Sequence, residues 1–204
     1  QDAGNPNKAI EVWKGIQRIE PDHPEAREAL MRLYASTDKW NALREMLKAE
    51  IDRLPADAVD AKIERHEQIV AIYRDHLKQD VMVLNTYAAI LQLRPDHPGA
   101  LDALEERYEK MGRWSDLAAV LQKRAASAAH MAEQIDYLRR AAQVWIEKLA
   151  NPAQAVKPLD DILALDPTDR DALAGLRGIH EKRRNWRGSA APSRVANEHD
   201  AARS

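Results

Sequence analysis

The feature that most constrains the fold of this chain is an internal repeat with a period of about 73 residues. The tetrapeptide Pro-Asp-His-Pro at 21–24 returns at 95–98. A tryptophan recurs at nearly the same interval, as Trp40, Trp114 and Trp186. A fixed period of this kind means that one structural unit is stacked on copies of itself. The sequence therefore predicts an array of nearly three modules.

Each module contains a helix with a characteristic spacing that ends in proline. A small residue is followed by a bulky residue four positions later, another three positions later, and Pro after five more, as in Ala9, Trp13, Ile16 and Pro21. Steps of three and four place the side chains on one helical face, and Pro ends the helix. The same spacing recurs in Val83, Tyr87, Ile90, Pro95; in Ala155, Leu159, Ile162, Pro167; and in Leu43, Leu47, Glu50, Pro55. In the last set, Glu50 replaces a core residue.

A second kind of helix follows each of these prolines. Two core residues lie four positions apart in it: Leu30 and Tyr34, Ile69 and Tyr73, Leu104 and Tyr108, Ala141 and Trp145, Leu176 and His180. Pro24 and Pro98 stand at the first turn of two such helices, where the missing backbone N–H is tolerated. The module is thus predicted to be two helical hairpins.

This pattern resembles the tetratricopeptide repeat (TPR) over about residues 5–186, in the degenerate form found in large multi-repeat bacterial proteins. The family's early tryptophan is replaced by Arg27, His66, Leu101, Leu138 and Leu173. The resemblance implies an all-α fold, an α-solenoid of antiparallel helix hairpins wound into a right-handed superhelix.

The repeat phase gives the expected boundaries of an array over residues 1–186. They are a half repeat at 5–21, hairpins at 22–55, 57–95, 96–130 and 131–167, and a lone helix at 168–184. The helices at 58–77 and 132–149 are expected to be longer than the family norm. Residues 187–204 read as a polar tail that we expect to be disordered. Because the chain does not begin with Met, we also expect its native N-terminus to be missing.

Composition excludes several classes of function. The chain has 204 residues and no Cys, which rules out a disulfide scaffold and a thiolate metal site. A net charge of −2 disfavours nucleic-acid binding. No apolar run reaches the roughly 18 residues of a membrane span, and no signal segment is seen, which favours a cytoplasmic location. The seven His residues show no ligand spacing, and no catalytic motif is present. We therefore expect no enzyme activity, metal or cofactor.

The aromatic and proline-flanking residues have structural explanations. Nine of the ten Trp and Tyr residues fall on repeat-signature positions, so we expect them to pack in the core. His23 and His97 stand directly before a helix-starting Pro, where a capping or turn role is expected.

The functional hypothesis concerns a surface. The TPR resemblance implies that the first helix of each hairpin lines a concave groove where another protein binds. The residues on the groove-facing steps are Glu25, Glu28, Arg32, Glu64, Glu67, Arg74, Asp102, Glu106, Glu109, Asp136, Arg139, Gln143 and Glu147. Acidic side chains dominate this set, which predicts a protein or peptide partner with a basic segment.

Two interpretations of function remain open. The first is a non-enzymatic scaffold or adaptor that binds a protein in the groove. The alternative is a structural array used for self-assembly or spacing within a larger protein. The first predicts a monomer, and the second predicts self-association through the open ends of the array.

Overall fold

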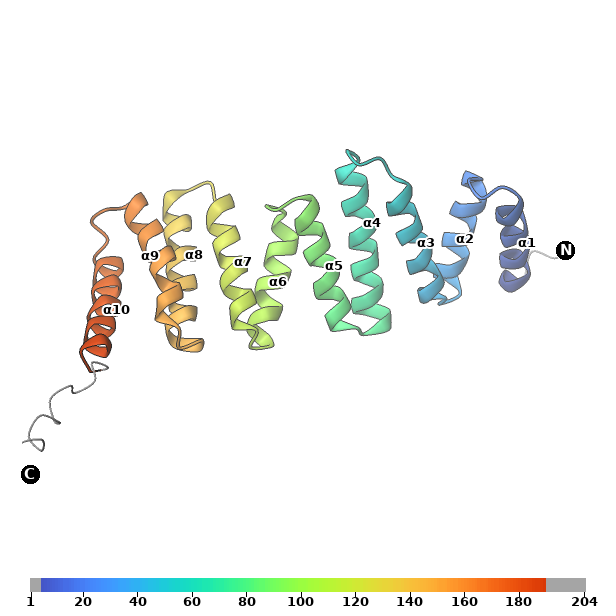
Figure 1. The fold of residues 1–204 in the computed structure, drawn as a ribbon. Helices are drawn as coiled ribbons and strands as arrows, with labels where there is room; N and C mark the ends of the chain where they lie inside the picture. Colours follow the sequence, from blue (N-terminus) through green and yellow to red (C-terminus); the bar gives the residue numbers. More distant parts are fainter. Residues whose placement is uncertain (1–4, 190–204) are drawn as a thin grey trace, which may run out of the picture. The chain divides into compact units, whose positions relative to one another are not determined.

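The computed structural model describes residues 5–189 and shows the predicted all-α array of helical hairpins, with no strand in that range (Figure 1). The elements are α1 (Pro6–Ile19), α2 (Pro24–Ser36), α3 (Trp40–Arg53), α4 (Val59–Ala71), the π-helical η1 (Ile72–Leu77), α5 (Asp80–Leu93), α6 (Pro98–Lys110), α7 (Trp114–Ser127), α8 (Met131–Gln143), the π-helical η2 (Val144–Lys148), α9 (Pro152–Leu165) and α10 (Arg170–Ser189).

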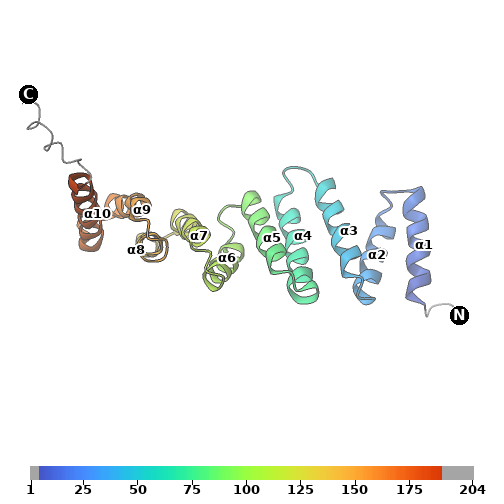
Figure 2. The ribbon, with the colours of Figure 1, turned by 60° about the horizontal axis from the view of Figure 1, so that its bottom comes forward.

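The chain forms two compact units, and the boundary between them falls within α6. Unit 1 is Gln1–Arg107 and unit 2 is Tyr108–Ser204. Within unit 1, helices α1 to α5 pack in chain order, each against the next. Within unit 2, helices α7 to α10 do the same. Figures 1 and 2 show that consecutive helices in each unit run antiparallel and are joined by short loops.

Each unit has its own apolar core at the predicted helical faces. Tyr34 packs with Ile10 and Leu30 between α1 and α2. Tyr73 is almost fully buried among α3, α4 and α5. Tyr108 is also buried, which confirms the core prediction for these three tyrosines.

The signature tryptophans and Tyr87 are less deeply buried than these three tyrosines. Four of the tryptophans are only partly buried, because their large rings reach the edge of the core: Trp13, Trp40, Trp114 and Trp145. The side chain of Trp186 lies outside the described part of the structure.

Histidine caps two of the helices, as the sequence predicts. The Nδ1 atom of His23 accepts a hydrogen bond from the backbone N–H of Ala26 at 3.3 Å. The Nδ1 atom of His97 accepts one from the N–H of Ala100 at 3.2 Å. Each bond satisfies one of the free N–H groups at a helix start, beside a proline that has none to offer.

The hairpin after α2 closes with a left-handed residue. Asp38 has a φ of 55°, and the backbone N–H of Lys39 donates to the carbonyl of Tyr34 at 2.9 Å. This is the Schellman arrangement, which satisfies carbonyls at a helix end. The same bond recurs one module later beside Gly112, which has a φ of 65°.

The two long helices end in a way that differs from the Schellman caps described above. Helix α4 continues into η1 and helix α8 into η2, so both reach about the length expected from the sequence. Lys78 and Ala150 are left-handed here, with φ values of 53° and 48°. The N–H of Gln79 donates to the carbonyl of Tyr73, six residues back rather than five, at 3.0 Å. The extra residue is taken up by the wider π-helical turn.

Helix α10 differs from the sequence prediction in two ways. It continues to Ser189, whereas the helix was expected to end at 184 and the tail to begin at 187. Residues 182–187 are mostly Lys and Arg, which are good helix formers, and no Pro interrupts the helix before its end. His180, predicted as a core residue, is exposed, and Ile179 is buried instead. The core-facing side of α10 is therefore shifted by one residue from the predicted side at this point. The rest of the predicted tail, 190–204, lies outside the described residues.

Candidate functional site

Unit 1 contains an open apolar pocket of about 460 Å³ between α2, α3 and α4. Its floor is the stripe Trp40, Leu43 and Leu47 of α3, spaced three and four residues apart. One wall comes from α2 and the other from α4 and η1. The lining residues are Glu28, Met31, Arg32, Ala35, Trp40, Leu43, Leu47, Arg65, Gln68, Ala71, Ile72 and His76. The interior is apolar, and the charged side chains belong to the walls.

The pocket stays open because its walls carry small residues. Ala35 on α2 and Ala71 on α4 line the pocket, and their methyl groups are too short to cover the floor formed by α3. Helices packed with bulkier residues at these points would fill the space with their own side chains.

A stacked pair closes one end of the pocket. The rings of Trp40 and His76 lie 3.5 Å apart between centroids, at an interplanar angle of 11°. The stack connects the start of α3 to η1, and both rings line the pocket. It therefore holds the indole of Trp40 in place at one end of the pocket floor.

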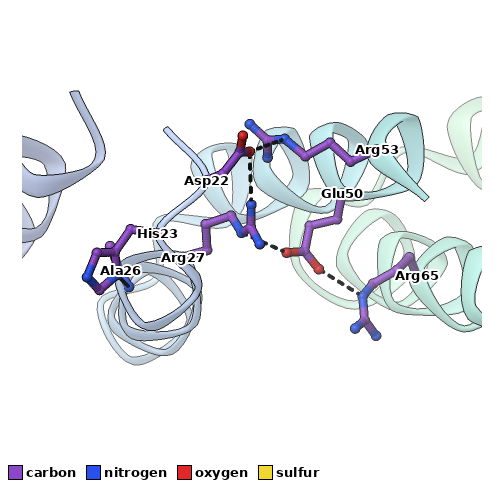
Figure 3. Close-up of polar contacts among 7 residues, drawn as sticks. All are labelled: Asp22, His23, Ala26, Arg27, Glu50, Arg53 and Arg65. Atoms are coloured by element: carbon purple, nitrogen blue, oxygen red, sulfur yellow. Dashed lines mark hydrogen bonds and ion pairs between the residues drawn. The ribbon is translucent and has the colours of Figure 1, made fainter. Parts of the chain in front are cut away.

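An ion-pair cluster connects the three helices at the pocket (Figure 3). Glu50 of α3 lies between two arginines, with Oε2 3.2 Å from Arg65 Nε and Oε1 3.7 Å from Arg27 Nε. Asp22 extends the cluster, 3.4 Å from Arg27 and 3.6 Å from Arg53. Arg65 is also a pocket residue, so the cluster fixes one wall.

The cluster explains the charged residue at a core position of the repeat. Only 18% of the Glu50 side chain is exposed, so its carboxylate has lost much of its water. Arg27 and Arg65 supply the compensating charge from the flanking helices. A half-buried carboxylate with two partners is tolerated, whereas removing a partner leaves an uncompensated charge.

The groove residues predicted in unit 1 are solvent-exposed, and two of them line the pocket. Glu28 and Arg32 form part of the α2 wall, 3.7 Å apart. Glu25 lies about one helical turn before Glu28 on α2. The others on α4 and η1 lie outside the lining: Glu64 beside Arg65 at 3.4 Å, Glu67 beside His97 Nε2 at 3.6 Å, and Arg74 hydrogen-bonded to Asp75 at 2.8 Å.

Unit 2 has a smaller pocket of about 190 Å³ between the end of α6, α7, α8 and η2. Its lining residues are Glu109, Trp114, Leu117, Leu121, Arg140, Gln143, Val144, Glu147 and Lys148. Predicted groove residues Glu109, Gln143 and Glu147 are therefore brought together here, and Gln143 donates to Glu147 at 3.4 Å.

The remaining predicted residues lie away from both pockets. Asp102 and Glu106 are exposed on α6, and Asp136 is exposed on α8. Arg139 is half-buried and forms a 2.8 Å ion pair with Asp169 before α10. Arg139 therefore connects α8 to the residue that precedes α10.

Sequence reasoning missed the apolar part of the site. It assigned Trp40 to the core and did not single out Ala35, Ala71 or His76. The repeat itself contained a signal for this pocket: the small residues at 35 and 71 align with the larger residues Glu109 and Gln143 in the following module.

Among residues 5–189, no group of His, Asp and Glu side chains is arranged to hold a metal ion. No helix in the described part of the chain is long and apolar enough to cross a membrane.

No protein-family model and no curated protein matches this chain. Among solved structures, it is similar to the C-terminal part of a TPR repeat-containing protein from Cytophaga hutchinsonii. The identity is 16%, the match covers 84% of this chain and 95% of that one, and the TM-score is 0.23. The fold assignment therefore rests on the helices and hairpins of this chain.

Proposed function

We propose that this chain is a non-enzymatic module that binds another protein on the exposed faces of α2 and α4 in unit 1. The observation that carries the proposal is the open apolar pocket between α2, α3 and α4. Exposed apolar hollows with a polar rim are typical of interaction sites, because a partner removes the apolar lining from water.

The charge of the surrounding surface indicates the kind of partner. Glu25, Glu28, Glu64 and Glu67 are all exposed on α2 and α4. The half-buried cation Arg65 is already paired with Glu50. We propose that these four carboxylates attract a basic segment of the partner and speed its association.

Charge reversal tests this proposal. Replacing the four carboxylates with Lys should weaken capture of a natural partner at least tenfold, and raising the salt concentration should weaken capture by the native chain. The control reverses Asp136 and Glu133 on α8, which should leave capture unchanged. Equal capture by all variants at every salt concentration would contradict the proposal.

A second function is favoured by a different observation. Helix α1 exposes two apolar side chains that lie two turns apart on the same face: Val12 is 64% exposed and Ile19 is 83% exposed. This face would support self-association. Light scattering of native chain and of Val12→Glu/Ile19→Glu tests it: concentration-dependent assembly that the double variant abolishes would favour a structural array.

A further inference from the structure

The unit 1 pocket has a shape that selects its occupant. It is formed over a helical stripe, Trp40, Leu43 and Leu47, which spans two turns of α3. In this chain, stripes with steps of three and four are the surfaces on which one helix packs against another. Among residues 5–189, Leu47 at one end of the stripe is buried, whereas Trp40 and Leu43 stay partly exposed where the pocket opens.

The volume argues for more than one side chain. A pocket of about 460 Å³ is larger than any single amino-acid side chain and lies within the usual range of ligand sites, about 300–1,000 Å³. Two apolar side chains one helical turn apart would lie over Trp40 and Leu43, the partly exposed part of the stripe. This is the geometry of an amphipathic helix in a groove.

The charges on the two walls indicate what flanks the apolar pair. Glu28 on the α2 wall and Glu64 beside the α4 wall have side chains that are 68% and 64% exposed. Arg32 lies 3.7 Å from Glu28 and offsets part of its charge. Arg65 lies 3.2 Å from Glu50 and 3.4 Å from Glu64, so it offsets part of the charge of both carboxylates. Lysines on both flanks of a bound helix would complement the two carboxylates.

From these observations we infer that the unit 1 pocket binds a basic amphipathic helix of a partner protein, through two apolar side chains placed one turn apart. The inference rests on the proposed function and makes it more specific. The basic flanks supply attraction, and the apolar pair supplies the contact that fixes the register of the helix on α3.

The probe for this inference is a designed helical peptide. It carries two Leu residues at i and i+4, Lys on both flanks and Ala elsewhere. Matched peptides replace the Leu pair with Ala, or place the second Leu at i+2, on the opposite side of the helix. Fluorescence anisotropy measures binding to the full chain, and the indole N–H signal of Trp40 reports the location.

The chain itself supplies a variant that closes the pocket. Ala35→Glu/Ala71→Gln introduces the residues found at the equivalent positions 109 and 143, which the fold tolerates in unit 2. Gln68→Arg, copying position 140, is a second closing variant at an exposed site. Helical content and melting temperature check that both variants fold.

We expect the Leu pair at i and i+4 to bind at least tenfold more tightly than either matched peptide and to shift the Trp40 signal. Both closing variants should lose at least tenfold in affinity. Equal binding of the three peptides, or undiminished binding to both closing variants, would overturn the inference. If a natural partner still responds to reversal of the four carboxylates, the proposed function survives that result; if it does not, both fail.

Discussion

The same repeat positions form a larger pocket in unit 1 and a smaller one in unit 2. Trp40, Leu43 and Leu47 correspond to Trp114, Leu117 and Leu121, so the floors are identical in sequence. The walls differ, and the pocket volume falls from about 460 to about 190 Å³. Among the wall residues that change from unit 1 to unit 2 are Ala35 to Glu109, Gln68 to Arg140, Ala71 to Gln143 and His76 to Lys148.

The two units also place different pairs of side chains at one core position of the repeat. In unit 1, Glu50 and Arg65 form an ion pair. At the equivalent positions in unit 2, the guanidinium of Arg124 lies 4.9 Å from the ring centre of Tyr137. The repeat therefore specifies helical faces and spacing, whereas side chains that contact each other at an interface change together from one unit to the next.

The largest expected effect is at the buried aromatic of the long helix. Tyr73→Ala should destabilise the folded chain by about 3–5 kcal/mol, because it leaves a cavity between α3, α4 and α5. Its counterpart Trp145 is only partly buried, so Trp145→Ala should cost less. Urea unfolding measures both, and an equal or larger cost for Trp145→Ala would show that the two positions are not distinguished by burial.

A smaller effect is expected at the ion-pair cluster. Glu50→Ala should cost about 1–2 kcal/mol, since it leaves Arg27 and Arg65 facing each other without the carboxylate between them. The control Glu45→Ala, at an exposed carboxylate of the same helix, should cost under about 0.5 kcal/mol.

The residues at the equivalent positions of unit 2 suggest a variant that restores the stability lost in Glu50→Ala. The triple change Arg27→Leu, Glu50→Arg and Arg65→Tyr copies positions 101, 124 and 137. It should be more stable than Glu50→Ala alone, because all three side chains change together to the set that the repeat carries one module later. A triple variant less stable than the single one would mean that the interface depends on its wider surroundings.

The left-handed caps should give changes of about 1 kcal/mol. Ala150 has a φ of 48°, where a Cβ atom is unfavourable, so Ala150→Gly should stabilise the chain. Gly112→Ala should destabilise it by a similar amount, since Gly112 has a φ of 65°. Gly178, within α10, is the control: there Gly→Ala should be neutral or stabilising because open space surrounds it. Thermal unfolding of the three variants checks these signs.

The smallest effect expected is a pH dependence. Burial lowers the pKa of His66 below its usual value near 6.5, and its Nδ1 atom has no hydrogen-bond partner among residues 5–189. The unfolded chain therefore binds the proton more readily, so this contribution to stability is complete above about pH 6.5 and falls as pH drops toward the folded pKa.

Unit 2 suggests the variant that removes this dependence. Leu138 stands at the equivalent position and is buried. His66→Leu should flatten the stability profile between about pH 5 and 7 relative to the native chain. Superimposable profiles for native and His66→Leu chains would show that another group sets the pH dependence.

The sequence predicted the helices, hairpins and most core residues because repeat spacing is a direct consequence of helix geometry. It also predicted the capping role of His23 and His97. It could not predict the pocket, because an opening between helices depends on what side chains from three elements leave unfilled. Ala35 and Ala71 look ordinary in isolation, and only their position opposite the α3 stripe gives them a role.

The end of α10 shows a further limit. The polar segment after residue 183 has no apolar face, which made a helix there look unsupported. Helix propensity and the absence of a breaker nevertheless carry α10 to Ser189. The error at His180 has a related cause: the adjacent Ile179 offers a better apolar side chain one step around the helix.

We propose that the open pocket makes unit 1 the partner-binding unit. The most direct test of this proposal places a photo-crosslinking amino acid at Gln68 of the unit 1 pocket or at Arg140, the equivalent position in unit 2. Each labelled chain is illuminated with the same natural partner. The account predicts a crosslink from position 68 at least tenfold stronger than from position 140. Equal crosslinking from the two positions, or stronger crosslinking from 140, would contradict it.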